Sequence, residues 1–362
     1  MSTIKVNNID PRNTGETVSV NSIAMPSAGA LSNRSKIING AMVHDQRNAG
    51  SAVTHTGSAN LYVLDRWVCN STGTPQFSVQ RVADGPTGFS YSSKLTTTTS
   101  GTPAAGDLSY YAHYIEGNNV ADLVFGTANA KTITVSFYVK SSLTGTFGGA
   151  LKNAVPNRAY PFSYTITSAN TWEYKTVTIA GDTTGTWATD ATIGLNLAFD
   201  TGSGSNNKGT AGAWAATADL GVTGGVNLVE SASATWQITG VQLETGTNAT
   251  PFEYRSYGDE LLRCSRYFVY ANWQFCSRIT GLTTRFIVPG PGVVQRILAD
   301  VSYFHPATGT ANQAREHSSG TAYTINDAND MLSNIATASQ YFGVTSATTY
   351  DVNVGTYYDA EL

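Results

Sequence analysis

The chain has 362 residues, enough for two or three domains at ~100–200 residues each. Apolar residues make up 41% of it, which excludes an intrinsically disordered chain, and charged residues only 13%, well below the usual ~25%. The net charge of −4 and the absence of a Lys/Arg cluster argue against nucleic-acid binding, and no apolar run of ~18 residues predicts insertion into a membrane.

The start of the chain and its cysteines bear on where the protein is made. The polar opening MSTIKVNNIDPR contains no apolar signal-peptide segment, so we expect synthesis in a cytoplasm without export through an N-terminal signal. Cys69, Cys264 and Cys276 form no CxxC pair, and their odd number and wide spacing argue against a disulfide framework or a zinc site. We interpret them as small buried apolar residues.

Residues 1–50 alternate short extended pieces with Asn, Pro, Gly and Ser. Two of these pieces, IKVNNIDP and ETVSVNSIAM, have strand-like composition, but an isolated pair of strands is marginally stable in water. We therefore interpret 1–50 as an extended N-terminal attachment arm that pairs with another protein or another copy of the chain. A flexible terminus is the alternative.

Residues 51–257 predict one all-β domain, because short strands follow one another with regular turn signals and no intervening helix. The candidate strands are YVLDRWVC, FSVQRVA, FSYSSKLTT, LSYYAHYIE, TITVSFYVKS, PFSYTIT, EYKTVTIAG, ATIGLNLAFD and ATWQITGVQLE. The Gly/Ala/Thr/Asn-rich residues 200–225 predict a long surface loop or a two-strand excursion. We expect a β-sandwich similar to a carbohydrate-binding module.

The stretch 236–268 marks the end of this domain. Trp236, Ile238, Val241 and Leu243 alternate as in a half-buried strand, and Gly240 shifts the phase in the manner of a β-bulge. GTNATP then ends the strand. In GDELLRCSRYF, apolar residues recur at helical spacing, so we expect a short helical neck over 258–268.

Residues 269–362 predict a smaller β-rich C-terminal tip module. Its candidate strands are VYANWQFCSRI, TTRFIVP, ILADVSYFHP, TAYTIND, SQYFGVTS and YDVNVGTYYDAEL. The segment NDANDMLSNIA has the pattern of a short helix, with Asn326 or Asp327 as its N-cap.

The junction resembles a pattern in tail-fibre and other appendage proteins of tailed bacteriophages. The matching residues are Val241-Gln242-Leu243-Glu244, Gly246, Ala249-Thr250-Pro251-Phe252-Glu253, Glu260-Leu261, Cys264 and Arg266-Tyr267-Phe268. Similar residues also occur at Thr3–Ile9, at Ile38–Met42 with Asp65-Arg66-Trp67, and at Asp359–Leu362. The resemblance implies a jelly-roll-like sandwich leading into a receptor-facing module, and a homotrimer. The trimer would place Leu261, Cys264 and Phe268 along a three-fold axis, the alternative being a helix that packs on its own sandwich.

Enzyme signatures are missing from the sequence. There is no GxSxG, HExxH or Walker pattern, and GSGSNNKG fails the patterns of phosphate-binding loops. The histidines are dispersed, and Asp182 and Asp190 lack the alternating acidic pattern of a calcium loop. We therefore predict no catalytic residue, no metal and no cofactor.

Aromatic clusters are the remaining candidates for a binding site, because exposed rings stack on sugars while nearby polar groups bind the hydroxyls. The candidate glycan-binding residues are Tyr270, Trp273, Tyr303, His305, Tyr110 and Tyr111. Strand alternation implies that about half of each cluster faces the core.

Together these observations predict a non-enzymatic virion protein, a phage tail fibre that attaches to a bacterial surface glycan. Its arm would bind other tail or virion proteins, and no nucleic acid or membrane insertion is expected. One alternative is a head fibre, capsid decoration or minor tail protein with an assembly role. A second is a polysaccharide depolymerase, which would need two carboxylates facing one sugar.

Overall fold

The computed structural model describes residues 19–20, 23–24, 32–57, 59–155, 157–277, 284–288, 300–304, 313–316, 322–324, 340–344 and 350–361. The chain divides into two compact units, Met1–Arg255 and Ser256–Leu362. The boundary lies two residues before the one expected at 257. In the described part of the chain, no helix is long and apolar enough to cross a membrane.

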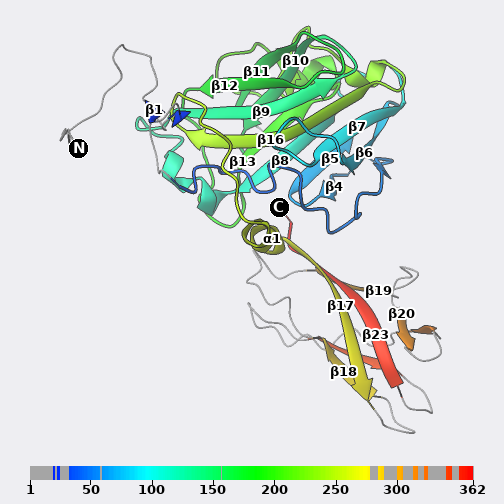
Figure 1. Ribbon diagram of the computed structural model, residues 1–362. Coiled ribbons are helices and arrows are strands. Elements are labelled where there is room, and N and C mark those ends of the chain that lie inside the picture. The colour runs from blue at the N-terminus through cyan, green and yellow to red at the C-terminus, as the bar shows by residue number, and fades with distance from the viewer. Residues whose placement is uncertain are drawn as a thin grey trace, which may run out of the picture. The chain divides into compact units, whose positions relative to one another are not determined.

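The first unit is a sandwich of two antiparallel sheets, which confirms the predicted all-β class (Figure 1). One sheet has the order β11-β10-β13-β8-β5-β4. Its strands are β11 (Ala159–Ile166), β10 (Gly145–Lys152), β13 (Ile193–Asp200), β8 (Ser109–Glu116), β5 (Trp67–Ser71) and β4 (Leu61–Leu64).

The second sheet has the order β12-β9-β16-β7-β6-β3. Its strands are β12 (Glu173–Ile179), β9 (Ile133–Ser141), β16 (Thr235–Thr245), β7 (Ser92–Thr99), β6 (Gln76–Val82) and β3 (Val53–Thr54). Two short strands, β1 (Ser19–Val20) and β2 (Ile23–Ala24), form a hairpin within the predicted arm.

Alternate residues of the strands fill the space between the sheets with large aromatic side chains. Trp67, Tyr111, Phe137, Phe199 and Trp236 all belong to this core, and each is at most 1% exposed. Burying one such side chain contributes roughly 4–6 kcal/mol before the entropy cost of ordering it. The indole Nε1 of Trp236 donates to the hydroxyl of Tyr164 at 3.1 Å, so its polar atom is paired inside the core.

One strand prediction is wrong in detail, and one strand was not predicted. The stretch expected as one strand, YVLDRWVC, is the hairpin β4–β5, in which Arg66 has a positive φ of 71°. Strand β10 has no counterpart among the predictions because its glycines hide the pattern. Gly149 must be glycine, since a Cβ there would lie 2.6 Å from the carbonyl oxygen of Ala198 on the neighbouring strand.

Connections at the edges of the sandwich carry short helical turns. These are η1 (Gly117–Asn119), η2 (Ala121–Leu123), η3 (Ser205–Asn207) and η4 (Leu228–Glu230). The predicted excursion at 200–225 contains two short parallel strands, β14 (Lys208–Gly209) and β15 (Gly221–Val222). The expectation of a loop with a two-strand excursion is therefore confirmed.

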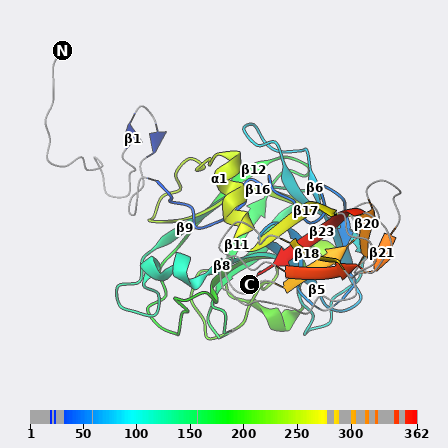
Figure 2. The same ribbon diagram turned by 90° about the horizontal axis from the view of Figure 1, so that it is seen from below.

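The second unit begins with helix α1 (Tyr257–Ser265), whose N-cap Ser256 accepts a hydrogen bond from the backbone N–H of Asp259. The strands that follow are β17 (Phe268–Ser277), β18 (Thr284–Val288), β19 (Asp300–Phe304), β20 (Gln313–Glu316), β21 (Ala322–Thr324), β22 (Gln340–Val344) and β23 (Tyr350–Asp359). Strand β23 pairs with β17, β19 and β20, and lies beside β17 in both Figure 1 and Figure 2. The helix expected at NDANDMLSNIA lies outside the described residues.

Candidate functional site

The outward face of the β12–β9–β16 sheet carries a packed group of aromatic rings. Along β9, Val135, Phe137 and Val139 point into the core, so Tyr138 points outward. Tyr138 is paired in register with Tyr174 of β12, and their ring centroids are 4.9 Å apart. Adjacent strands thus place two tyrosine rings side by side on the surface.

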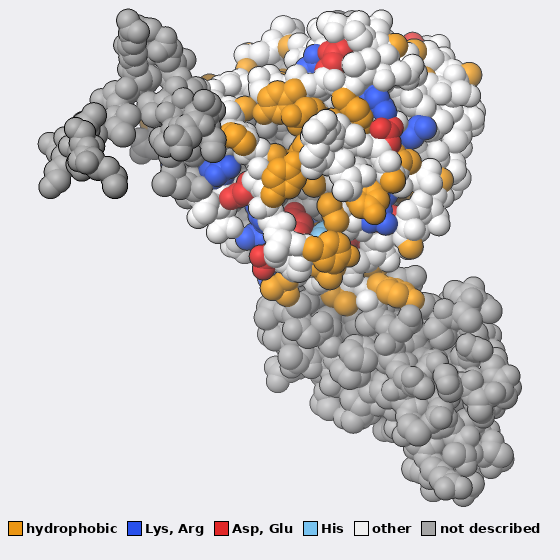
Figure 3. Space-filling view, viewed as in Figure 1, with side chains coloured by type: hydrophobic (Ala, Val, Ile, Leu, Met, Phe, Trp, Pro, Cys, Tyr) orange, Lys and Arg blue, Asp and Glu red, His pale blue; other side chains and the backbone are white. Residues whose placement is uncertain are grey.

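Three further rings extend this pair across the sheet. Phe89 lies 5.4 Å from Tyr138, 5.1 Å from Phe252 and 5.5 Å from Tyr254 between ring centroids. We call the five residues Phe89, Tyr138, Tyr174, Phe252 and Tyr254 the aromatic platform. Hydrophobic side chains gather over β12, β9 and β16 in Figure 3. Tyr174 is 45% exposed and Tyr254 60% exposed, so the platform offers ring surface to solvent.

A bulge in β16 makes room for the platform. The register of β16 against β9 shifts between Thr239 and Gln242, which confirms the bulge predicted at Gly240. Gly240 has a φ of +62°, and a Cβ there would lie 2.7 Å from Cζ of Phe89 and 3.0 Å from Cδ2 of Tyr138. Only glycine therefore lets the rings lie directly on the backbone. The hydroxyl of Tyr254 donates to the carbonyl oxygen of Gly88 at 3.0 Å and fixes the outer ring.

Polar groups border the platform. Thr176 and Thr178 follow Tyr174 on the same exposed face of β12. Lys140 of β9 forms an ion pair with Asp84, and its ammonium lies 5.0 Å from the ring centroid of Trp172. The hydrogen bond from Lys140 lowers the pKa of Asp84, which keeps that carboxylate ionised. Rings next to hydroxyls and a charge pair suit a ligand with both apolar and hydroxyl faces.

Tyr110 and Tyr111 do not present ring faces as the sequence suggested. Tyr111 is 0% exposed and stacks on Trp67 with a centroid distance of 5.1 Å, so it is a core residue. Tyr110 points out of the other sheet but is only 6% exposed, and its hydroxyl donates to Oδ1 of Asn60 at 2.7 Å. Burial raises the pKa of both phenols. Neither ring is available for stacking on a sugar.

The described C-terminal candidates lie on two strands of one sheet. Tyr270, 37% exposed, and Trp273 belong to β17, and Tyr303 belongs to β19. Both strands pair with β23, where Tyr270 is opposite Tyr357 and Tyr303 is opposite Thr356. His305 lies outside the described residues. Glycan binding at these positions stays a prediction.

The predicted neck differs from the structure at its end. Helix α1 ends at Ser265, so Phe268 starts β17 instead of continuing the helix. Cys264 is 0% and Phe268 2% exposed within the single chain, so neither is free to line an axis between copies. Leu261 is half-buried, while Leu262 is 59% exposed on the helix.

Two buried thiols and one paired carboxylate have structural roles. Cys69 and Cys264 are buried free thiols, and burial raises the pKa of Cys69 to about 12. Both carboxylate oxygens of Asp182 accept hydrogen bonds from Arg158, at 2.6 and 2.7 Å, which occupies the oxygens that a calcium ion would need. No group of three or more His, Cys, Asp or Glu that could hold a metal occurs in the described part of the chain.

Solved structures that are similar to this chain have low similarity scores. A CBM4 structure shares 15% identity over 57% of this chain and 97% of its own, at a TM-score of 0.29. A protein of Bacteroides thetaiotaomicron VPI-5482 described as sugar binding shares 9% over 59% of this chain and all of its own, at 0.33. A family 11 carbohydrate-binding module from Clostridium thermocellum shares 12% over 56% of this chain and all of its own, at 0.28.

These identities and TM-scores assign no function to the chain. No family model matches it, and no curated protein matches it.

Proposed function

We propose that the chain is a non-enzymatic structural protein of a tailed-phage virion, a tail fibre whose sandwich binds a bacterial surface glycan at the aromatic platform. The single observation that carries the glycan part is the platform itself, in which Tyr174 and Tyr254 expose ring surface on a rigid sheet. The phage part rests on the resemblance of residues 241–268, with the N-terminal arm as the attachment to other virion proteins.

The chemistry of a pyranose fits this surface. One face of the ring carries C–H groups that pack on an aromatic side chain, while its hydroxyls need polar partners at the edge. Tyr138 and Tyr174 supply the aromatic surface, and the exposed residues Thr176 and Thr178 lie two and four pairs further along β12. The platform lies on the outer surface of a sheet, so each site would bind weakly and several copies would be needed for stable attachment.

Replacing Tyr174 or Tyr254 by alanine is expected to weaken binding of the protein to host surface polysaccharide by about 10-fold, because a ring that contacts the sugar is removed. Binding is measured by isothermal titration with polysaccharide fragments. Tyr257→Ala is the matched control, since Tyr257 is 66% exposed but lies outside the platform.

Two results of this titration would contradict the proposal. Equal affinity of wild type, Tyr174→Ala and Tyr254→Ala would remove the platform as the site and favour an assembly role in a head fibre, capsid decoration or minor tail protein. Shortened polysaccharide chains after incubation with the wild type would instead identify a depolymerase.

A homotrimer belongs to the same proposal. Sedimentation equilibrium at micromolar concentration is expected to give three times the 38.3 kDa mass of the chain. The exposed side chain of Leu262 on α1 is the residue we expect at the contact between copies, in place of the buried Cys264 and Phe268. Leu262→Glu should lower the mass to that of one chain by placing a charge in the contact. A monomeric wild type would contradict the trimer.

A further inference from the structure

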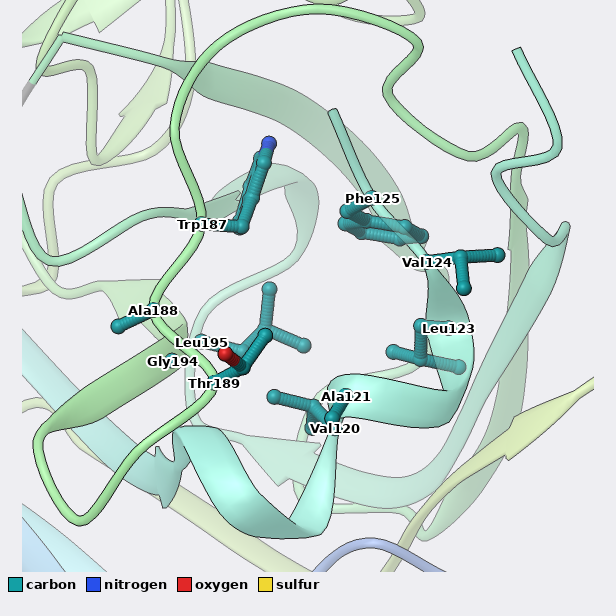
Figure 4. Close-up of a pocket in the computed structure, with 10 residues that line it drawn as sticks. All are labelled: Val120, Ala121, Leu123, Val124, Phe125, Trp187, Ala188, Thr189, Gly194 and Leu195. Atoms are coloured by element: carbon teal, nitrogen blue, oxygen red, sulfur yellow. The ribbon is translucent and has the colours of Figure 1, made fainter. Parts of the chain in front are cut away.

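A small pocket opens at one end of the sandwich, between the η1–η2 connection and the loop before β13 (Figure 4). Its volume is about 30 Å³, whereas a single water molecule needs ~10–15 Å³. The residues that line it are Val120, Ala121, Leu123, Val124, Phe125, Trp187, Ala188, Thr189, Gly194 and Leu195. The pocket therefore has room for a group of two or three heavy atoms, and Thr189 is the only lining residue with a polar side chain.

Aromatic rings form one wall of the pocket and are fixed in place. Phe125 and Trp187 face one another edge to face at a centroid distance of 5.0 Å, as Figure 4 shows, and Trp214 lies 5.4 Å from Trp187. The indole nitrogen of Trp187 donates to the carbonyl oxygen of Thr184 at 3.1 Å, and that of Trp214 to Ala180 at 2.7 Å. The wall is formed before any ligand binds.

The two loops that frame the pocket are held close together. A Cβ on Gly117 would lie 2.6 Å from the carbonyl oxygen of Ala188, and a Cβ on Gly194 would lie 2.5 Å from Cα of Gly117. The backbone N–H of Gly126 donates to the carbonyl oxygen of Asp182 at 2.7 Å. The pocket therefore keeps its shape through backbone packing.

The rim of the pocket is strained and reaches solvent. Val124 has a φ of +48°, a conformation that a β-branched residue rarely adopts, and its side chain is 38% exposed. Thr189 on the opposite loop is also exposed. Strained backbone at the rim of a pre-formed apolar pocket is typical of ligand sites.

We infer that this pocket binds the methyl group of a methyl-bearing sugar, either the acetamido methyl of an N-acetylhexosamine or the C6 methyl of a 6-deoxyhexose. The inference rests on the proposed glycan binding and names the sugar class. A methyl or acetyl group fills the volume, and its burial against Leu195, Leu123 and Trp187 requires no polar partner. The hydroxymethyl group of an ordinary hexose would leave its oxygen unpaired there. The exposed Thr189 hydroxyl lies at the rim for the polar part of the same sugar.

The test compares three sets of oligosaccharides by isothermal titration of the wild-type protein, which detects binding at the pocket and at the platform alike. One set contains N-acetylhexosamines, one contains 6-deoxyhexoses and one contains only ordinary hexoses. We expect one of the methyl-bearing sets to bind about 10-fold more tightly than the hexose set, the gain that one methyl group brings in an apolar pocket. Which set does so identifies the source of the methyl group.

Ala121→Leu is expected to abolish this preference by filling the pocket while leaving hexose binding at the platform unchanged. Ala105→Leu is the matched control, since Ala105 is exposed on a loop that does not line the pocket. Ala121→Ser adds a hydroxyl without filling the space and should reduce the preference partially. Equal binding of all three sets, or a preference that survives Ala121→Leu, overturns the inference alone. No binding of any set overturns both it and the proposed glycan binding.

Discussion

Replacing Glu244 by alanine is expected to lower the free energy of unfolding of the sandwich by about 4 kcal/mol, because a buried carboxylate at the centre of a polar network is removed. Glu244 is 1% exposed. Its Oε1 accepts from the backbone N–H of Thr250 and from Nε2 of Gln242, both at 2.8 Å, and its Oε2 accepts from Oγ1 of Thr250 at 2.7 Å. Nε of Arg34 lies 3.6 Å from Oε2.

The network explains why the change is costly. The variant would remove the acceptor of the buried backbone N–H and hydroxyl of Thr250 and the 2.8 Å acceptor of Nε2 of Gln242, and each buried donor left unpaired carries a penalty of ~1–3 kcal/mol. The network also joins distant parts of the chain, since the backbone N–H of Ser35 donates to Glu253 at 3.0 Å and Arg255 donates to the carbonyl oxygen of Ser35 at 2.7 Å. Loss of Glu244 would therefore also loosen residues 34–37.

Urea unfolding followed by tryptophan fluorescence measures the effect as a shift of the midpoint at unchanged slope. Glu244→Gln keeps the shape of the side chain but removes the charge and one acceptor, so an intermediate loss is expected. Glu230→Ala is the matched control, because Glu230 is exposed and its removal should change stability by less than ~0.5 kcal/mol. A Glu244→Ala midpoint equal to that of Glu230→Ala would contradict this account of the network.

The same network gives a physical reason for the sequence pattern at the junction. In the stretch 241–253, Gln242, Glu244, Thr250 and Glu253 bond to one another or to residues 34–37. Burial alone would raise the pKa of Glu253. The backbone N–H groups of Ser35 and Arg34 and the charges of Arg255 and Arg34 lower the pKa by more than burial raises it, so the carboxylate stays ionised. The pattern therefore specifies how the N-terminal segment is fastened to the last strand.

Much of the fold could be predicted because alternation along a strand reports burial directly. The predicted strands TITVSFYVKS and EYKTVTIAG correspond to β9 and β12, and the phase shift predicted at Gly240 corresponds to a bulge. Strand β10 could not be predicted, because Gly148 and Gly149 have no side chains to show a pattern and are required by close neighbours from other strands. Pairing across the sandwich imposes that requirement, and pairing is invisible in a local window.

The candidate site was largely missed for a related reason. Adjacent aromatic residues such as Tyr110 and Tyr111 were predicted as site residues. Adjacent residues of a strand point to opposite faces of the sheet, so one of the two rings points inward, and Tyr111 lies in the core. The platform instead combines Tyr138 and Tyr174, which are single aromatics at outward positions of amphipathic strands. This outward placement could have been predicted from the alternation of apolar and polar residues along each strand. The positions of Phe89 and Tyr254 depend on the paths of loops and could not be predicted from the sequence.

Replacing Gly240 by valine is expected to lower the free energy of unfolding by about 3 kcal/mol and to weaken glycan binding by at least 10-fold. Part of the loss is backbone strain, because φ of +62° is unfavourable for any residue with a Cβ and most of all for a β-branched one. The rest is steric, because the Cβ would lie 2.7 Å from Phe89 and 3.0 Å from Tyr138. Those rings would have to tilt away from the sheet, and the exposed surface formed with Tyr174 would lose its shape.

Gly212→Val separates the two effects. Gly212 also has a positive φ, +96°, but a Cβ there meets nothing within 4 Å, so this variant pays the strain without displacing a ring. Its stability should fall, while its affinity for polysaccharide fragments should equal that of the wild type. Gly240→Asn also adds a Cβ, but asparagine tolerates a positive φ. This variant should therefore lose a larger share of its affinity for glycan than of its free energy of unfolding. Normal affinity of Gly240→Val would mean that the rings resting on the bulge take no part in the site, because the platform cannot keep its geometry with a side chain beneath it.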